Sequence, residues 1–188
     1  MAADVAGVLD RAASALAELR SLDLDGVGDD VLSDAVLSLQ RLRGGLEVAE
    51  ARVLARWDAQ GAWRPSGAKT AAAWLAWKER LPMGVARQRV RHARALRGMP
   101  AVEQAWGDGD IDRSHLVTLL GARTPRTAEV FDTDHKVLLD VARTESFRGF
   151  KRACDHFRMV VDPDGTEDRA AQDRQAREVH LSESFGGM

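Results

Sequence analysis

The sequence predicts an all-α protein, a multi-helix bundle, from three observations. Apolar residues recur every three to four positions along most of the chain, which is the spacing of one helix face. Asp, Ser or Thr stands before most of these segments and Gly or Pro follows them, as at helix ends. One short stretch alone, around Val179 and Leu181, alternates in the manner of a strand. With 188 residues, 45% of them hydrophobic, the chain is large enough to bury a core.

The first third of the chain predicts two helices. The first covers residues 3–20, and a break rich in Asp and Gly follows at residues 22–28. Asp29 or Asp30 caps a long second helix that runs to about Trp57. Gly44 and Gly45 lie inside it, where each costs about 1 kcal/mol relative to alanine, so we expect a kink or a weak point there.

The middle of the chain predicts a helix, a short turn and a second helix. After a loop at residues 61–67, Ser66 or Lys69-Thr70 opens a helix that runs to about Glu79. Residues 81–84 form a turn, because Pro82 disfavours the helical conformation in the residue before it. The next helix covers residues 85–97. This pair is compatible with a helix-turn-helix, although Pro82 and Gly84 make the turn atypical.

The remainder predicts four more helices, at residues 101–106, 112–120, 127–143 and 145–161. Thr127 is expected to cap the third of them, and residues 162–165 (DPDG) predict a turn. We therefore expect a helical domain at 1–161, a polar helix or linker at 162–177, and the start of a β segment at 178–188. No partner strand is evident, so this strand is expected to be left unpaired by truncation of a longer protein, the alternative being a frayed tail.

The net charge of −2 conceals a basic middle segment. Residues 1–60 carry 6 Lys or Arg against 11 Asp or Glu, and residues 101–188 carry 12 against 17. Residues 61–100 carry 9 basic residues against the single Glu79. A polyanion would respond to this segment rather than to the average charge. The 23 arginines against 4 lysines indicate that arginine is also partly a coding habit of a GC-rich genome.

The basic face belongs to the helix expected at residues 85–97. At 100° per residue, Arg87, Arg91 and Arg94 fall within about 60° of one another, opposite an apolar arc. That arc consists of Val85, Ala86, Val90, Ala93 and Leu96. Lys78 and Arg80 precede the helix and extend the candidate nucleic-acid-binding set. Arg89 projects into the apolar arc, so we expect it to be paired and partly buried.

Other chemistry is sparse. Cys154 is the one cysteine, which excludes a disulfide within the chain and multi-cysteine metal sites, and we expect it to be a buried, inert thiol. His92 is expected to be half-buried and His115 to serve in capping or packing. The Asp134-His135 and Asp155-His156 pairs point about 100° apart on a helix, so surface positions are expected. The five tryptophans are expected to be core residues, with base stacking as the alternative.

No catalytic motif, metal site or cofactor site is therefore expected in this chain. The Gly-rich phosphate loop, the serine-nucleophile elbow and the zinc-protease motif are all missing from the sequence. No apolar run approaches the roughly 20 residues of a membrane span, and the N-terminus lacks the basic segment of a secretory signal. We expect a cytoplasmic protein.

Several segments together resemble the actinobacterial domain of unknown function 222 (13E12 repeat) family. The resemblance covers the chain from about residue 30 to its end and lies in an ordered set of segments: GLEVAEAR at 45–52, AWLA at 73–76, ARQRVRHARAL at 86–96, MPAV at 99–102 and GDIDRSH at 109–115. It implies a helical region that stands before a C-terminal HNH endonuclease domain. It supplies no catalytic residue here, because the chain has no HNH hairpin.

Two functions remain open at this stage, with a third behind them. The first is a non-catalytic module of an HNH-endonuclease-type protein that binds or positions DNA through the basic helix. The second is a helical protein-interaction or self-association domain, and the third is a truncated, non-functional remnant. Burial of Arg87, Arg91 and Arg94, or pairing of all three with carboxylates, would exclude the first. We also expect their joint replacement by alanine to leave folding nearly intact.

Overall fold

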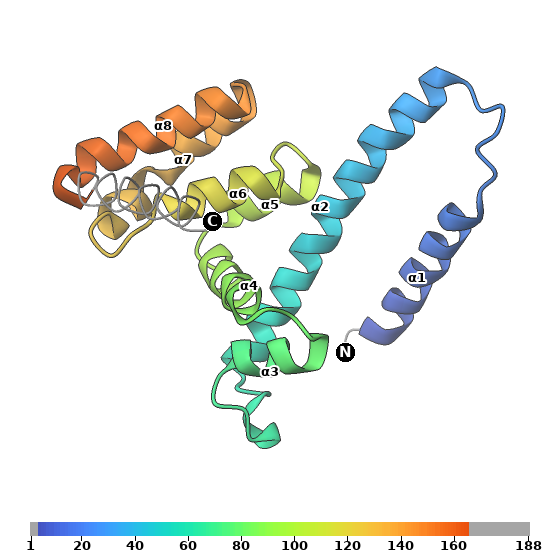
Figure 1. Cartoon of the computed structure of the whole chain (residues 1–188), viewed down its shortest axis with the longest axis horizontal. Coiled ribbons are helices and arrows are strands. Elements are labelled where there is room, and N and C mark those ends of the chain that lie inside the picture. Colours follow the sequence, from blue (N-terminus) through green and yellow to red (C-terminus); the bar gives the residue numbers. More distant parts are fainter. Residues whose placement is uncertain (1–3, 166–188) are drawn as a thin grey trace, which may run out of the picture. The chain divides into compact units, whose positions relative to one another are not determined.

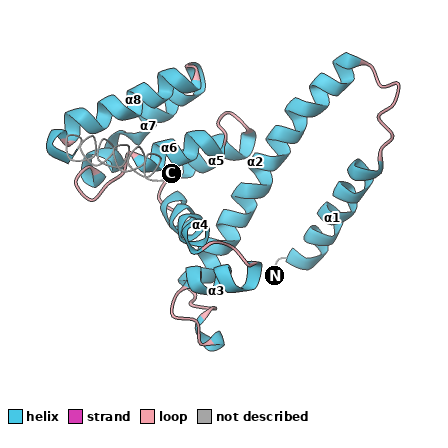
Figure 2. Ribbon diagram, viewed as in Figure 1, coloured by secondary structure: helices cyan, strands magenta, loops and turns pink. Residues whose placement is uncertain are grey.

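The computed structural model describes residues 4–165, and over this range the protein is built of helices and connecting loops (Figures 1 and 2). This confirms the predicted all-α class. The predicted polar helix or linker at 162–177 lies outside the described residues from residue 166 on, and the β segment predicted at 178–188 lies wholly outside them. The chain divides into two compact units, residues 1–39 and 40–188.

The first unit contains α1 (Val5–Ser21) and the beginning of α2 (Asp29–Ala59). The carboxylate of Asp4 caps α1 by accepting a hydrogen bond from the backbone N–H of Gly7 at 3.0 Å. The break predicted at residues 22–28 separates the two helices, as expected. No side chain of α1 is buried, so this helix contributes no described residue to a core.

The second unit holds the rest of α2 and the remaining helices, which Figure 1 labels along the chain. They are a 3₁₀ turn at Arg64–Ser66, α3 (Ala71–Glu79), α4 (Met83–Leu96), α5 (Pro100–Asp108), α6 (Arg113–Gly121), α7 (Ala128–Thr144) and α8 (Phe147–Val161). Side chains cap several of them: Thr70 accepts from Ala73 N–H, Asp112 from His115 N–H and Ser146 from Gly149 N–H.

Two apolar clusters form the core of the second unit. The larger one packs α5, α6, α7 and α8 around Phe131, Phe150 and Leu139. The smaller one packs α2, α3 and α4 around Leu54, Leu75 and other residues. The two clusters adjoin at α4, because Leu96 belongs to the first and Val90 and Ala93 to the second. Helix α4 is therefore packed from Ala86 to Leu96.

Two local expectations in the first half of the chain concern α2 and the turn before α4. Helix α2 runs through Gly44 and Gly45 without interruption, and the backbone of α5 lies against Gly44. The turn before α4 is shorter than predicted, because α4 begins at Met83, with Pro82 at its N-terminal cap. A proline just before the first turn is tolerated there because the first N–H groups of a helix have no partner within it.

Two more expectations concern the ends of α7 and α8. Thr127 stands at the cap of α7 but makes no capping bond; its buried hydroxyl donates to the carbonyl oxygen of Ala122 at 2.7 Å. Residues 163–165 are helical rather than a turn. The Asp162 carboxylate accepts from Gly165 N–H at 3.1 Å, so the DPDG segment places a capping aspartate before a proline that starts a helix.

Candidate nucleic-acid interface

Helix α4 has the two faces that its sequence predicts. Ala86, Val90, Ala93 and Leu96 are buried, with 0 to 4% of their surface exposed. Arg87, Arg91 and Arg94 are exposed on the other side. Val85 is an exception, since it was expected among the packed residues and is 37% exposed. One side of the helix thus packs in the apolar core, and the other side presents guanidinium groups.

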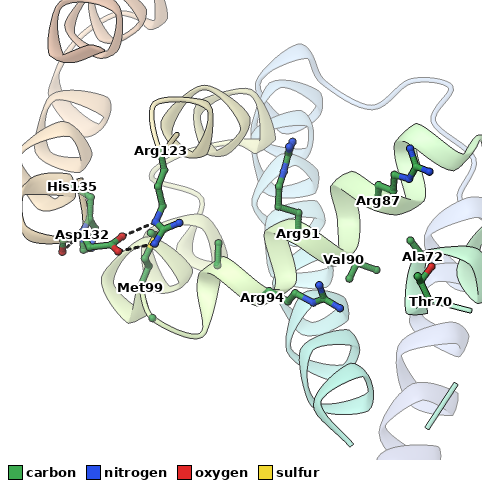
Figure 3. A pocket seen from close by; sticks show the side chains of 12 residues that line it. Thr70, Ala72, Arg87, Val90, Arg91, Arg94, Met99, Arg123, Asp132 and His135 are labelled. Carbon is green, nitrogen blue, oxygen red and sulfur yellow. Dashed lines mark hydrogen bonds and ion pairs between the residues drawn. The ribbon is translucent and has the colours of Figure 1, made fainter. Parts of the chain in front are cut away.

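An open cavity of about 790 Å³ lies against the arginine face of α4. Arg87, Arg91 and Arg94 line it from α4, and Arg123 lines it from the connection between α6 and α7. Figure 3 shows the three α4 side chains on one helix, with Arg123 reaching toward Asp132 of α7 at the left of the view. We call this cavity the arginine groove. Its wall combines four guanidinium groups with one carboxylate.

Two of the three predicted arginines have no acidic partner among the residues that the structure describes. Arg87 and Arg91 are exposed, and no described carboxylate pairs with them. Arg94 differs, because its Nε and Nη2 donate to the two carboxylate oxygens of Asp58 at 2.7 and 3.1 Å. The condition that would exclude DNA contact, burial or pairing of all three arginines, is therefore not met.

Asp58 is held beneath Arg94 at the end of α2. Its side chain is only 8% exposed, whereas that of Arg94 is 54% exposed. The hydrogen bonds from Arg94 outweigh the opposing effect of burial and hold the pKa of the Asp58 carboxyl below its usual value. The pair fixes the orientation of Arg94 while its remaining N–H groups stay accessible at the groove.

The far side of the groove contains residues that sequence reasoning missed. Arg123 donates from Nε and Nη2 to the two oxygens of Asp132, both at 2.7 Å. His135 also lines the groove and is 6% exposed, with its Nδ1 near the carbonyl oxygens of Phe131 and Asp132. No sequence signal joins these residues to α4, because helical periodicity relates positions within one helix only.

Three other predicted cations lie away from the groove wall. The Lys78 ammonium lies 4.3 Å from the centroid of the exposed Trp77 ring, a cation–π contact. Arg80 ends α3 in the left-handed conformation, with φ of 54°. Neither of them lines the groove. Arg89 is half-buried and pairs with Glu79 at 2.6 Å and with Glu50, as its place in the apolar arc predicts.

The remaining candidates are structural, and three differ from expectation. His92 is buried, with 5% of its surface exposed, rather than half-buried. Trp77 is 65% exposed rather than a core residue. His135 is buried rather than a surface residue, whereas Asp134 and His156 are exposed as expected. The predicted capping role of His115 is confirmed, since its N–H and ring both bond Asp112. Cys154 is buried as expected, and burial raises its thiol pKa to about 12, which disfavours the reactive thiolate form.

Two further kinds of feature are absent from residues 4–165. Within this range, no cluster of three or more His, Cys, Asp or Glu side chains is arranged to hold a metal ion. None of the helices in the same range has both the length and the apolar character needed to cross a bilayer.

Comparison with known proteins places the chain in a family. Among curated proteins and among solved structures, nothing matches it. Residues 33–188 match the family described as Domain of unknown function (DUF222). This span includes most of α2, all of α3 to α8 and every residue of the arginine groove. The chain therefore belongs to the DUF222 family.

Proposed function

We propose that the arginine groove binds the phosphate backbone of DNA. The observation that carries the proposal is that Arg87 and Arg91 are exposed and have no carboxylate partner among residues 4–165. Arginines whose charge is not needed internally are available to phosphates. Arg94 and Arg123 extend the positive wall of the same cavity. The groove contributes charge and donors rather than catalytic groups, so its role is to hold or position DNA.

Binding through these groups favours affinity over sequence readout. Guanidinium contacts to phosphates fix a protein on the duplex and carry no direct sequence information. The proposal has a second part, which rests on the family resemblance: the domain positions DNA for an HNH endonuclease domain, in the cytoplasm.

The test is a titration of the protein with fluorescently labelled duplex DNA by anisotropy at 50 and 200 mM salt. We expect binding that weakens as salt rises, because each phosphate that the protein neutralises releases bound cations. Arg87→Ala/Arg91→Ala should lower the affinity. It should also reduce the slope of log K against log salt by up to about 0.9 for each phosphate that is no longer neutralised.

The matched control is Arg148→Ala/Arg152→Ala, which removes the same charge from exposed positions on α8, outside the groove. This control should bind nearly as well as the unaltered protein. Equal decreases in affinity in the two double variants would mean that overall charge, rather than the groove, attracts DNA. Absence of binding at 50 mM salt would contradict the proposal.

A second candidate function is self-association through α2. Within the second unit, Leu42, Leu46 and Val53 of α2 are exposed. Their spacings of four and seven fit a helix face of the type that pairs in coiled coils. Sedimentation velocity distinguishes this candidate: a dimer that dissociates in Leu46→Lys supports it, and a monomer contradicts it. A protein that neither dimerises nor binds DNA would fit the remnant alternative.

A further inference from the structure

We propose that the Asp132 carboxylate pairs with Arg123 in the absence of DNA and that a DNA phosphate displaces it when DNA binds. Asp132 thereby lowers the affinity of the arginine groove for DNA. The inference rests on the proposed function and adds a regulatory residue to the same site. It is carried by the contrast between two ion pairs whose arginines line the groove. The pairs share one geometry and differ in how deeply the carboxylate is buried.

The shared geometry is a side-on, bidentate pair. Arg123 donates from Nε and Nη2 to both oxygens of Asp132 at 2.7 Å, as the dashed lines in Figure 3 show. A phosphate presents two oxygens to a guanidinium in the same way. Asp132 therefore fills the position in which a phosphate would bind Arg123.

The burial of the two carboxylates separates their roles. The Asp58 side chain, paired with Arg94, is 8% exposed, whereas the Asp132 side chain is 48% exposed. Releasing Arg94 would leave a buried charge without its partner, which is costly. The exposed Asp132 carboxylate can be solvated by water after it releases Arg123, so this pair is easier to break than the Arg94–Asp58 pair. Asp58 is thus a fixed positioning residue for Arg94, and Asp132 is replaceable.

The position of Arg123 makes the exchange relevant to DNA. Arg123 and Asp132 line the same groove as Arg87 and Arg91. A strand whose phosphates contact α4 would bring negative charge to this cavity, where it would repel Asp132 and attract Arg123. Because DNA must first break the Arg123–Asp132 pair, the groove binds DNA more weakly than it would if Arg123 were already free.

The experiment measures duplex DNA binding by the whole chain at 50 mM salt. Asp132→Asn keeps the size of the side chain and should tighten binding roughly two- to five-fold, the most that an exposed pair of this strength can supply. The matched control is Asp134→Asn, which removes the same charge from an exposed position on the same helix, outside the groove. It should change binding by less than Asp132→Asn does.

A double-mutant cycle isolates the pair itself. Arg123→Ala should weaken binding, and Asp132→Asn should have no further effect in the Arg123→Ala background. Far-UV circular dichroism and the melting temperature of each variant confirm that all are folded. An equal gain from Asp132→Asn in both backgrounds would show a general charge effect and overturn the inference, as would no gain at all. If no variant binds DNA, the proposed function fails as well; if all bind alike, this inference alone fails.

Discussion

At Gly44 the lack of a side chain decides how closely α2 approaches α5. A Cβ added there would lie 2.5 Å from the carbonyl oxygen of Trp106, which is part of the α5 backbone and cannot rotate away. At the adjacent Gly45 the nearest atom is the Gly107 carbonyl oxygen at 3.7 Å, an ordinary contact. Two neighbouring glycines with the same helix propensity therefore have different roles.

We predict opposite effects of alanine at these two positions. Gly44→Ala should lower the free energy of unfolding by about 1–3 kcal/mol, because the clash with α5 exceeds the gain in helix propensity. Gly45→Ala should raise it by up to about 1 kcal/mol. Urea denaturation followed by far-UV circular dichroism measures both. A stabilising Gly44→Ala would mean that α2 and α5 are not in this close contact.

The lowered pKa of His92 should make the free energy of unfolding depend on pH. Burial, followed by the nearby charges of Arg91 and Arg113, lowers its pKa from 6.5 to about 4. The folded state therefore binds this proton less readily than the unfolded state does. The stability associated with His92 is fully present above pH 6.5 and is lost as the pH falls toward 4, by roughly 3 kcal/mol in all at 1.36 kcal/mol per unit.

The measurement is the free energy of unfolding by urea at pH values between 7 and 4. In His92→Gln, which cannot titrate, the decline over this window should be smaller than in the unaltered protein. Decreases in stability below this window arise from carboxyls with lowered pKa, such as that of Asp58, and should persist in the variant. Identical pH profiles for both proteins would contradict the assignment.

Among the elements, α4 contributes both to the apolar core and to the arginine groove. Its buried side contributes to both apolar clusters, and its exposed side supplies three of the four arginines of the groove. The arginines nevertheless differ in how much folding depends on them, because Arg94 alone among these three neutralises a buried carboxylate. We therefore expect only Arg87 and Arg91 to be replaceable without loss of stability, rather than all three arginines.

We predict that Arg87→Ala/Arg91→Ala leaves the melting temperature within about 2 °C of the unaltered protein, since surface changes are usually worth within about 0.5 kcal/mol. Arg94→Ala should cost about 1–2 kcal/mol, because Asp58 keeps its charge in a mostly buried place without its partner. Adding Asp58→Asn to Arg94→Ala should recover part of this decrease. Differential scanning calorimetry compares the four proteins.

Across the molecule, the second unit has two apolar clusters that meet at shared helices. Leu96 at the end of α4 belongs to the larger cluster, and Ala51 of α2 packs against both. A helix that is shared in this way couples the two clusters, because loosening either one exposes apolar surface of the other. We expect them to unfold together.

The prediction is a single unfolding transition in which both clusters take part. Leu75→Ala in the smaller cluster and Leu139→Ala in the larger should each cost about 2–5 kcal/mol, since both side chains are buried. Each should shift the tryptophan fluorescence and the far-UV circular dichroism to the same new midpoint. Two separate midpoints in either variant would show that the clusters are independent folding units.

Features that depend on neighbours along the chain followed from the sequence. Hydrophobic periodicity and capping residues predicted the order of the described helices and the two faces of α4, because side chains three and four positions apart share one side of a helix. The same reasoning placed Arg89 in a paired, half-buried position. The chain's membership in its family also followed from ordered segments of sequence.

Features that depend on contacts between distant segments required the packing of the helices. It brought Arg123 and Asp132 to the groove of α4, gave Asp58 to Arg94, and placed the α5 backbone against Gly44. It also buried His135 and left Trp77 exposed. Propensity and periodicity are properties of one helix, whereas the pairing of carboxylates with arginines depends on how the helices pack. Among the four arginines that line the groove, this packing pairs Arg94 and Arg123 and leaves Arg87 and Arg91 without a carboxylate partner in the described part of the chain.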